Sequence, residues 1–476
     1  MKIILPIIAG AVVLPVSAAV AKTLLTPQKV SAYVPEPDEK RAMEYAEKLQ
    51  KMVRFETVSS QDGSHVEKFR EFHKILAELF PLLHENLEKT EIDGNLLYYW
   101  KGKSSDKPLI LMSHQDVVPA EGEWTHEPYS GDIADGKIWG RGTGDVKAGV
   151  LGFMQAVEEL LAEGYVPEND VYLASSCTEE WGGDGAPKII EELKRRNVKP
   201  YMVCDEGGGI VNEPIGGVKG NFAMIGVFEK GQGRLRFTAH SQGGHASAPP
   251  KNSPIARLAA FENHVEKHNP FKSVISKEVR AMFEALAPYG SFPMRLLLGN
   301  IWLFGPLMKL AMPAVSPQAA AMLRTTVAFT MQSGSDAFNV LPQEATVGAN
   351  LRYIPHQGMD ESNAIIEKIA AKYGLTTEIV SAEDFSPPVD ITGDGFATVV
   401  EAINRSFPGL PHSPYVMTGG TDCRFYQEIC DNCFRFAPLI YGPEQLKGMH
   451  GIDENIEIAC LPGAVDFYKN MIDLNR

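Results

Sequence analysis

The fold of this chain is constrained most strongly by an apolar run in the sequence that ends in a histidine and an aspartate. Residues 109–112 are typical of a buried parallel strand, and His114 and Asp116 follow directly. Asp145 comes after a glycine-rich turn, residues 140–144, and precedes an apolar segment that suits a helix. Because α/β sheets carry their chemistry at the carboxyl ends of the strands, His114 and Asp145 are candidate metal ligands. A strand-end histidine that only forms a hydrogen bond is the alternative.

Two further predicted strands also end in acidic residues. Residues 171–175 lead to Glu179 and Glu180, and residues 201–204 lead to Asp205 and Glu206. Paired carboxylates beside a buried strand are costly unless a cation neutralises them, and a pair of divalent metal ions would do so. A solvated loop is the alternative for any one of these sites, but three in series favour a metal centre.

The order of the predicted elements divides the chain. Strands and helices alternate with short links, which predicts an α/β domain whose mixed, mostly parallel sheet is flanked by helices. Near residue 231 the pattern changes to strict alternation, as expected for an inserted α+β domain. We expect a targeting segment at residues 1–21 and a linker at 22–37. The main domain would comprise residues 38–230 and 354–476, with the inserted domain at 231–353 between its two parts.

The first 21 residues are typical of a targeting segment. Residues 3–21 are apolar or small apart from Ser17, and small residues near their end resemble a cleavage site. This pattern favours a signal peptide and a secreted or periplasmic protein. An uncleaved membrane anchor is the alternative, because the segment is nearly long enough to span a bilayer. Export would permit disulfides among the six cysteines, but their spacing assigns no pairing.

Charge and hydropathy narrow the partners. A net charge of −15 argues against nucleic acid or an anionic membrane surface, because phosphate groups are bound by clustered Lys and Arg. Residues 291–312 are unusually apolar, but proline and glycine interrupt them too often for a membrane span. They form either core, the wall of an apolar substrate pocket, or a surface that contacts lipid.

Eight motifs then follow one another in a specific order. They are S-H-x-D-V-V-P, G-R-G-x-x-D-x-K-x-G, T-E-E, D-E-G-G, G-H-A-S-x-P, N-V-x-P, G-G-T-D and M-H-G-x-D-E. From about residue 39 to the C-terminus the chain resembles peptidase family M20, the di-zinc aminoacylases and carboxypeptidases. Within that family it is most similar to the secreted N-fatty-acyl-amino-acid synthase/hydrolases and the vacuolar Gly-X carboxypeptidases. The resemblance implies a zinc-peptidase-like catalytic domain and makes the insert a lid.

The resemblance also implies roles for the metal-binding residues. Asp145 would bridge two zinc ions, with His114 and Asp205 completing one site and Glu180 and His450 the other.

Further roles concern the proton transfers and the backbone. Asp116 would hydrogen-bond the far nitrogen of His114, and Glu179 would be the catalytic base. Relatives often have a cis peptide after the bridging aspartate, here Asp145-Val146.

The remaining family residues would act on the substrate. His245 resembles the lid histidine that donates to the oxyanion, in some relatives across a homodimer interface. Asn339, Arg352 and Gly420 resemble groups that hold the substrate and its carboxylate, although a surface ion pair is the alternative for Arg352. We therefore expect a metal-dependent amidohydrolase that cleaves, or forms, N-acyl amino acids with apolar, fatty acyl groups. A dipeptidase or Gly-X-type carboxypeptidase acting on short peptides is the first alternative, and a metal-free binding protein on the same fold is the second.

Overall fold

Strand β3 (Ser104–Met112) contains the apolar run that anchors the sequence analysis. In the computed structural model, which describes residues 4–31, 33–35 and 38–476, β3 lies inside the main sheet. Its neighbours, β6 (Asn169–Ser175) and β7 (Met202–Asp205), both run parallel to it. Alternate side chains of residues 109–112 enter cores on opposite faces of the sheet, because successive side chains of a strand point in opposite directions.

Seven more strands complete this sheet: β1 (Glu88–Ile92), β2 (Asn95–Trp100), β8 (Gly209–Asn212), β9 (Asn221–Glu229), β16 (His412–Met417), β17 (Cys433–Arg435) and β18 (Ile440–Tyr441). Their order is β1-β2-β6-β3-β7-β17-β9-β8-β18, with β16 beside β9. The central strands β6, β3, β7 and β17 pair in parallel, whereas β1, β2, β8 and β9 make antiparallel pairs. The predicted mixed, mostly parallel sheet is confirmed.

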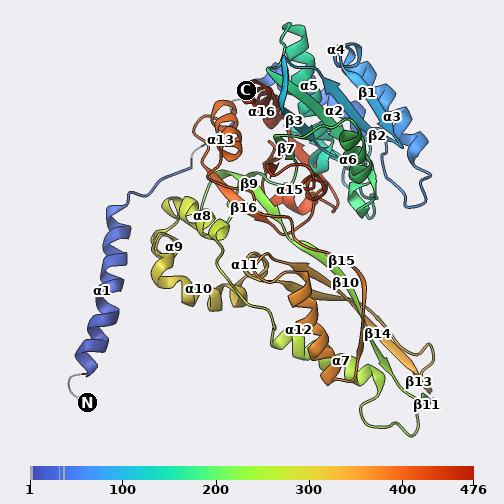
Figure 1. The fold of residues 1–476 in the computed structure, drawn as a ribbon, viewed down its shortest axis with the longest axis vertical. Coiled ribbons are helices and arrows are strands. Elements are labelled where there is room, and N and C mark those ends of the chain that lie inside the picture. The colour runs from blue at the N-terminus through green and yellow to red at the C-terminus, as the bar shows by residue number, and fades with distance from the viewer. Residues whose placement is uncertain (1–3, 32, 36–37) are drawn as a thin grey trace.

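Helices cover both faces of the main sheet (Figure 1). One face carries α2 (Glu39–Val53), α3 (Val66–Leu79), α4 (Pro81–Asn86), α5 (Ala148–Ala162), α13 (Asp394–Ser406) and α16 (Leu461–Leu474). The other carries α6 (Gly185–Arg195) and α14 (Cys423–Tyr426). The six cysteines are all buried, and none forms a disulfide in the described structure.

A small second sheet brings the C-terminal part of the chain to the glycine-rich turn. It consists of β4 (Ile133–Ala134), β5 (Lys137–Trp139) and β19 (Asn455–Glu457). Strand β5 leads into the turn before Asp145, and β19 follows the loop that carries His450. Their antiparallel pairing therefore places these two residues, far apart in sequence, near each other.

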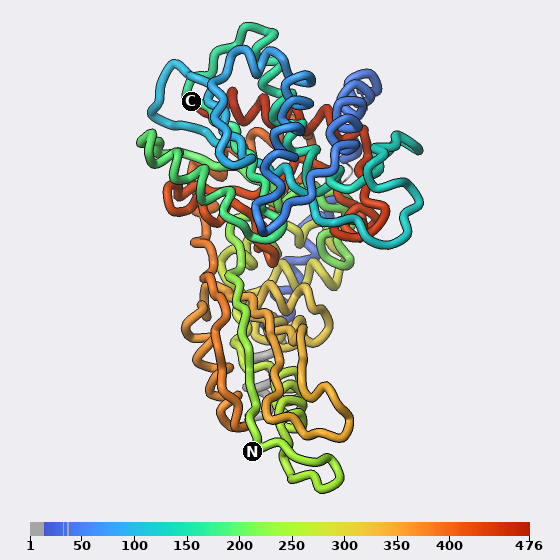
Figure 2. Tube along the Cα trace, turned by 90° about the vertical axis from the view of Figure 1, so that its right-hand side faces the viewer, coloured from blue at the N-terminus to red at the C-terminus, as the bar shows by residue number. Residues whose placement is uncertain are grey.

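The inserted lid is an elongated body that extends from the main domain (Figure 2). Its sheet has the order β12-β14-β10-β15, formed by β10 (Gly231–His240), β12 (Thr326–Ser333), β14 (Glu344–Tyr353) and β15 (Thr376–Glu383). Helices α7 (Pro254–Lys267) and α12 (Met359–Lys372) pack on this sheet. A short ladder of β11 (Gly244–His245) and β13 (Val340–Leu341) forms the far tip of the lid in Figure 1.

The sequence analysis predicted that the lid ends at residue 353, but in the structure the lid continues beyond that residue. Strand β15 pairs antiparallel with β10, and α12 packs against the same sheet, so the chain returns to the main domain only after Glu383. The predicted helix and strand in this region are both present. Their assignment to the main domain was wrong because the residue pattern of one strand does not determine which other strand it pairs with.

A helical segment, residues 277–323, lies between the lid sheet and the main domain (Figure 1). It comprises α8 (Lys277–Leu286), α9 (Phe292–Leu298), α10 (Ile301–Val315) and α11 (Pro317–Leu323). Val279, Met282 and Phe283 of α8 share a core with Phe222 and Val416 of the main sheet. The apolar stretch 291–312 therefore belongs to a junction that packs on the main domain and not on the lid sheet.

Helix α1 (Ile4–Leu25) packs against this junction. Lys22 Nζ donates to the carbonyl of Gly299, and Asn300 Nδ2 donates to the Thr23 hydroxyl. Within the described residues no single helix is long and apolar enough to span a bilayer, although α9 and α10 meet that criterion as a pair bent by 101°.

Candidate metal centre and active site

The carboxyl edge of the main sheet gathers the acidic and histidine residues predicted from sequence. His114 follows β3, and Glu179 and Glu180 begin a single helical turn after β6. Glu206 follows β7, while Asp145 lies in the turn before α5. The peptide Asp145-Val146 is cis, as the family resemblance implied.

Asp145 lies at the middle of this cluster. Its Oδ1 is 3.1 Å from His114 Nε2, and its Oδ2 is 3.0 Å from His450 Nε2. On the far side, His450 Nε2 is also 3.0 Å from Glu180 Oε2. One carboxylate thus faces two imidazoles from opposite ends of the chain, which is the arrangement expected of a ligand shared by two metal ions.

Glu206, and not Asp205, completes the His114 side of the cluster. Glu206 Oε1 is 3.3 Å from His114 Nε2. The Asp205 carboxylate instead accepts the backbone N–H of Glu206 at 2.8 Å and of Cys423 at 2.9 Å. The side chain that faces His114 is therefore Glu206 and not Asp205, the predicted ligand, since adjacent residues at a strand end point in different directions.

Asp116 fixes both His114 and the acidic turn. The far nitrogen of His114, Nδ1, is 2.8 Å from the main-chain carbonyl of Asp116 and 3.5 Å from its carboxylate. The shorter contact that orients the imidazole goes to the carbonyl, and the predicted contact with the Asp116 carboxylate lies beside it. The carboxylate accepts the backbone N–H groups of Glu179 and Glu180, each at 3.2 Å. Asp116 thereby links the loop after β3 to the turn after β6.

Glu454 has a supporting role that the sequence analysis missed. Its buried carboxylate accepts from Arg141 Nη1 at 2.7 Å and from the backbone N–H groups of Gly142, Gly144 and Asp145. These bonds shape the glycine-rich turn and so aim Asp145. The available signal was an acidic residue four positions after His450, in the M-H-G-x-D-E motif.

Four carboxylates and two imidazoles meet here, and burial perturbs their pKa values. Burial raises the pKa of Glu206 to about 7 and the pKa of Glu179 well above its usual value. Hydrogen bonds to Asp145 and Glu180 raise the pKa of the His450 imidazole to about 10. The excess of carboxylates calls for divalent cations. Glu180 Oε1 is buried with no hydrogen-bond partner among the described residues, which fits an unused ligand atom.

Glu179 lies beside the cluster. One of its oxygens lies within 4.8 Å of the ligand atoms of both His114 and Glu206. Its carboxyl group is thus near enough to exchange a proton with a molecule bound there, and burial, which raises its pKa, makes it a better proton acceptor than an exposed carboxylate.

A cavity of about 500 Å³ opens next to the cluster. Asp145, Glu206 and His450 line it, together with largely apolar side chains and the loop that contains Gly420. A Cβ at Gly420 would lie 2.6 Å from Arg424 Nη1, so a larger residue here would displace the end of that flexible side chain.

Arg352 lies in a neighbouring cleft that also includes Gly420. The guanidinium is partly buried. Its pKa is lowered mainly by this burial and, to a smaller extent, by the positive charge of the nearby Arg424. No described carboxylate lies within ion-pair distance of Arg352, and its Nε donates only to Asn350, at 3.2 Å. A surface ion pair, the alternative reading of Arg352, is therefore not what the structure contains.

His245 and Asn339 lie far from the cluster within one chain. The backbone N–H of Ala246 donates to the Asn339 carbonyl at 3.0 Å, so both residues share the exposed tip of the lid (Figure 1). Neither lines the cavity beside the cluster. They can reach a metal centre only by a large lid movement or in a second copy of the chain.

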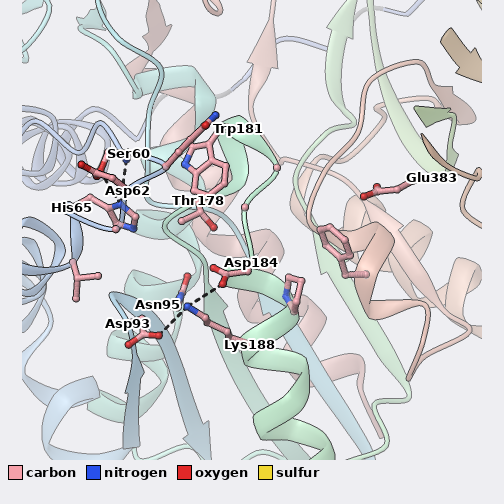
Figure 3. Close-up of a pocket in the computed structure, with 17 residues that line it drawn as sticks. Ser60, Asp62, His65, Asp93, Asn95, Thr178, Trp181, Asp184, Lys188 and Glu383 are labelled. Carbon is pink, nitrogen blue, oxygen red and sulfur yellow. Dashed lines mark hydrogen bonds and ion pairs between the residues drawn. The ribbon is translucent and has the colours of Figure 1, made fainter. Parts of the chain in front are cut away.

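A polar cavity of about 730 Å³ lies on the outer side of the acidic turn (Figure 3). Figure 3 shows Lys188 between Asp93 and Asp184, with Glu383 of the lid across the opening. None of the clustered acidic or histidine ligand candidates lines it. It is thus a cleft between the two domains and separate from the candidate metal centre.

Comparisons with known proteins identify the family of the chain. The model of peptidase family M20/M25/M40 matches residues 110–474. A probable carboxypeptidase S-like 2 from Dictyostelium discoideum is 32% identical over 464 residues, covering 94% of this chain and 88% of that protein. The human N-fatty-acyl-amino acid synthase/hydrolase PM20D1 is 33% identical over 445 residues, covering 91% and 88%.

Solved structures share the fold. An M20 family metallo-carboxypeptidase, Sso-CP2 from Sulfolobus solfataricus, superposes with a TM-score of 0.67 at 18% identity, covering 90% of this chain and 99% of that one. Human carnosine dipeptidase 1 gives a TM-score of 0.61 at 17% identity, covering 91% and 97%. The chain belongs to peptidase family M20 and is a metal-dependent hydrolase.

Proposed function

We propose that this protein is a di-zinc amidohydrolase that cleaves the amide bond of N-acyl amino acids with apolar acyl groups. The observation that carries the proposal is the Asp145 carboxylate between His114 and His450, at the end of a largely apolar cavity. The name of the human relative, an N-fatty-acyl-amino acid synthase/hydrolase, supports the substrate class. In the same geometry, formation of the amide is the reverse reaction.

The donor set fits two zinc ions. His114, Glu206 and one oxygen of Asp145 would hold the first, and His450, Glu180 and the other oxygen of Asp145 the second. When bound, the ions supply Lewis-acid activation of the amide carbonyl and lower the pKa of the attacking water.

Glu179 and Arg352 then act on the substrate. Glu179 accepts the proton of the attacking water and passes it to the leaving amine, in the manner of a general base that becomes a general acid. Arg352, which has no carboxylate partner in the described structure, pairs with the free α-carboxylate of the amino acid, beside the backbone of Gly420. This contact restricts the enzyme to substrates with a free carboxyl end.

A homodimer through the lid would supply His245 and Asn339. Both lie at the exposed tip of β11 and β13, away from the cavity of their own chain, which leaves them available to a second copy. Mixing inactive Glu179→Gln with inactive His245→Ala chains should restore about a quarter of native activity, because half of the dimers are mixed and each has one intact site. Restoration of none would place His245 in the site of its own chain or outside catalysis.

The substrate class is tested by comparing N-oleoyl-phenylalanine with Gly-Leu, with and without chelator. We expect the acyl amino acid to be cleaved only when zinc is present. Cleavage of Gly-Leu alone would favour the alternative, a dipeptidase or Gly-X-type carboxypeptidase, which the carboxypeptidase S-like relatives support. Turnover of neither substrate in zinc would refute both.

Export and lipid contact are further parts of the proposal. The apolar character of α1 supports a signal peptide, or alternatively an anchor, and hence a secreted or periplasmic protein.

Exposed Trp302, Leu307 and Leu310 on α10 support contact with a neutral lipid surface. N-terminal sequencing of the exported protein separates cleavage from anchoring, and flotation with phosphatidylcholine vesicles tests the lipid contact.

A further inference from the structure

A second, strongly apolar cavity of about 590 Å³ lies in the helical junction. Its walls are α9, α10, α11 and the loop of residues 214–216. None of the described residues that line it is charged, and the polar ones are Ser316 and Gln318. We call this cavity the acyl groove.

The acyl groove is continuous with the cavity at the metal centre. Pro214, Ile215, Gln318 and Met322 line both. A chain attached to a carbonyl beside Asp145 would therefore have an apolar path out of the metal centre and along the groove. Met322 suits this position because the flexible methionine side chain adapts to irregular apolar partners.

The groove is not simply a filled core. Leu307 and Val315 line it and yet are 59% and 80% exposed, so apolar surface faces water when the groove is empty. The hydrogen bonds that α1 makes to the junction go to Arg295, Gly299 and Asn300, which lie outside the groove lining. An apolar ligand would bury this surface.

We propose that the acyl groove binds the acyl chain of the substrate and sets the preference for acyl length. This inference rests on the proposed function and adds the place where the chain lies. Because no charged side chain lines the groove, a long alkyl chain gains free energy there while a peptide's polar N-terminal residue would lose hydration. The groove therefore separates fatty acyl amino acids from dipeptides.

Two substitutions are chosen to narrow the groove at residues that line it. Gly216 lies at its wall, and a Cβ added there would meet nothing within 4 Å, so Gly216→Leu projects into open space. Ala311 is an exposed residue of α10 that lines the groove, which makes Ala311→Trp a second block. Ala314 is exposed on the same helix but outside the groove lining, so Ala314→Trp is the matched control.

The measurement is kcat/KM for N-acetyl-, N-octanoyl-, N-dodecanoyl- and N-oleoyl-phenylalanine. In the native enzyme we expect a rise of up to about fourfold for each methylene buried, until the groove is full. Gly216→Leu and Ala311→Trp should lower the ratio of oleoyl to acetyl kcat/KM at least about tenfold, which corresponds to the loss of roughly two buried methylenes. Ala314→Trp should leave this ratio at the native value. An unchanged ratio in both groove variants, or an equal change in the control, would overturn the proposal.

Binding of parinaric acid, a fluorescent fatty acid, to the zinc-free protein separates this inference from the proposed function. The groove predicts saturable binding that both groove variants weaken and the Ala314→Trp control does not. Binding of this kind without any cleavage of acyl amino acids would retain the groove and refute the proposed reaction. Cleavage without chain-length preference and without parinaric acid binding would retain the reaction and refute the groove.

Discussion

Separate substitutions of the two adjacent acidic residues after β7 distinguish the metal ligand from the residue that supports the backbone. Glu206 Oε1 lies 3.3 Å from His114 Nε2, whereas both Asp205 oxygens accept backbone N–H groups, from Glu206 and Cys423. Glu206→Gln removes a charged metal donor, so we expect zinc affinity at one site to fall by more than about 100-fold, the upper range for loss of a supporting partner.

Asp205→Asn should behave differently. Asparagine keeps one acceptor but turns an NH₂ group toward the second backbone N–H, which costs about 1–3 kcal/mol of folding free energy. Because the ligands remain, zinc affinity should fall by about 100-fold at most.

The assay is zinc per chain after dialysis against buffers of fixed free zinc, with urea unfolding of the zinc-free proteins in parallel. We expect Glu206→Gln to lose one zinc at a free concentration where Asp205→Asn retains both, and Asp205→Asn to have the larger loss of urea stability. If Asp205→Asn loses a zinc while Glu206→Gln keeps two, the assignment of ligand and support is reversed.

Three further predictions concern single side chains. Glu179→Gln should retain its zinc, measured by metal analysis, and lose about 10²–10⁴-fold in kcat, because only proton transfer is removed. Loss of zinc instead would make Glu179 a ligand. Arg352→Met should lower kcat/KM about 100-fold, mostly through KM, since two charge-assisted hydrogen bonds to the substrate carboxylate are lost; an unchanged KM would contradict this role. The pKa of His450, about 10 in the folded zinc-free protein, lies above its unfolded value of about 6.5, so its stabilising charge is fully present below pH 6.5 and is lost as the pH rises through 10. The urea midpoint of the zinc-free protein should therefore fall over that range, and His450→Gln should reduce the fall.

The strands and the cluster they carry could be predicted from the sequence because each signal is local. A buried apolar run followed at once by His114, or by Glu179 and Glu180, indicates both the strand and the edge at which it ends. His450 was found only through the family resemblance, since its proximity to Asp145 depends on β19 pairing with β5.

The errors come from information that is not local. Whether Asp205 or Glu206 faces the metal depends on the direction of one side chain and on Cys423, a residue 218 positions away whose N–H takes the Asp205 carboxylate. The end of the lid depends on which strand β15 pairs with, and the apolar stretch 291–312 required coordinates to show that it lines a groove. The positions of His245 and Asn339 depend on how the lid extends from the main domain, which no local pattern of residues determines.

The central claim is that Asp145 joins two metal ions at the carboxyl edge of the main sheet. Anomalous X-ray diffraction from crystals of the zinc-loaded protein, recorded above and below the zinc edge, tests it directly. The account predicts two peaks about 3.5 Å apart, one on each side of the Asp145 carboxylate, next to His114 and His450. A single peak, or two peaks that Asp145 does not separate, would contradict it.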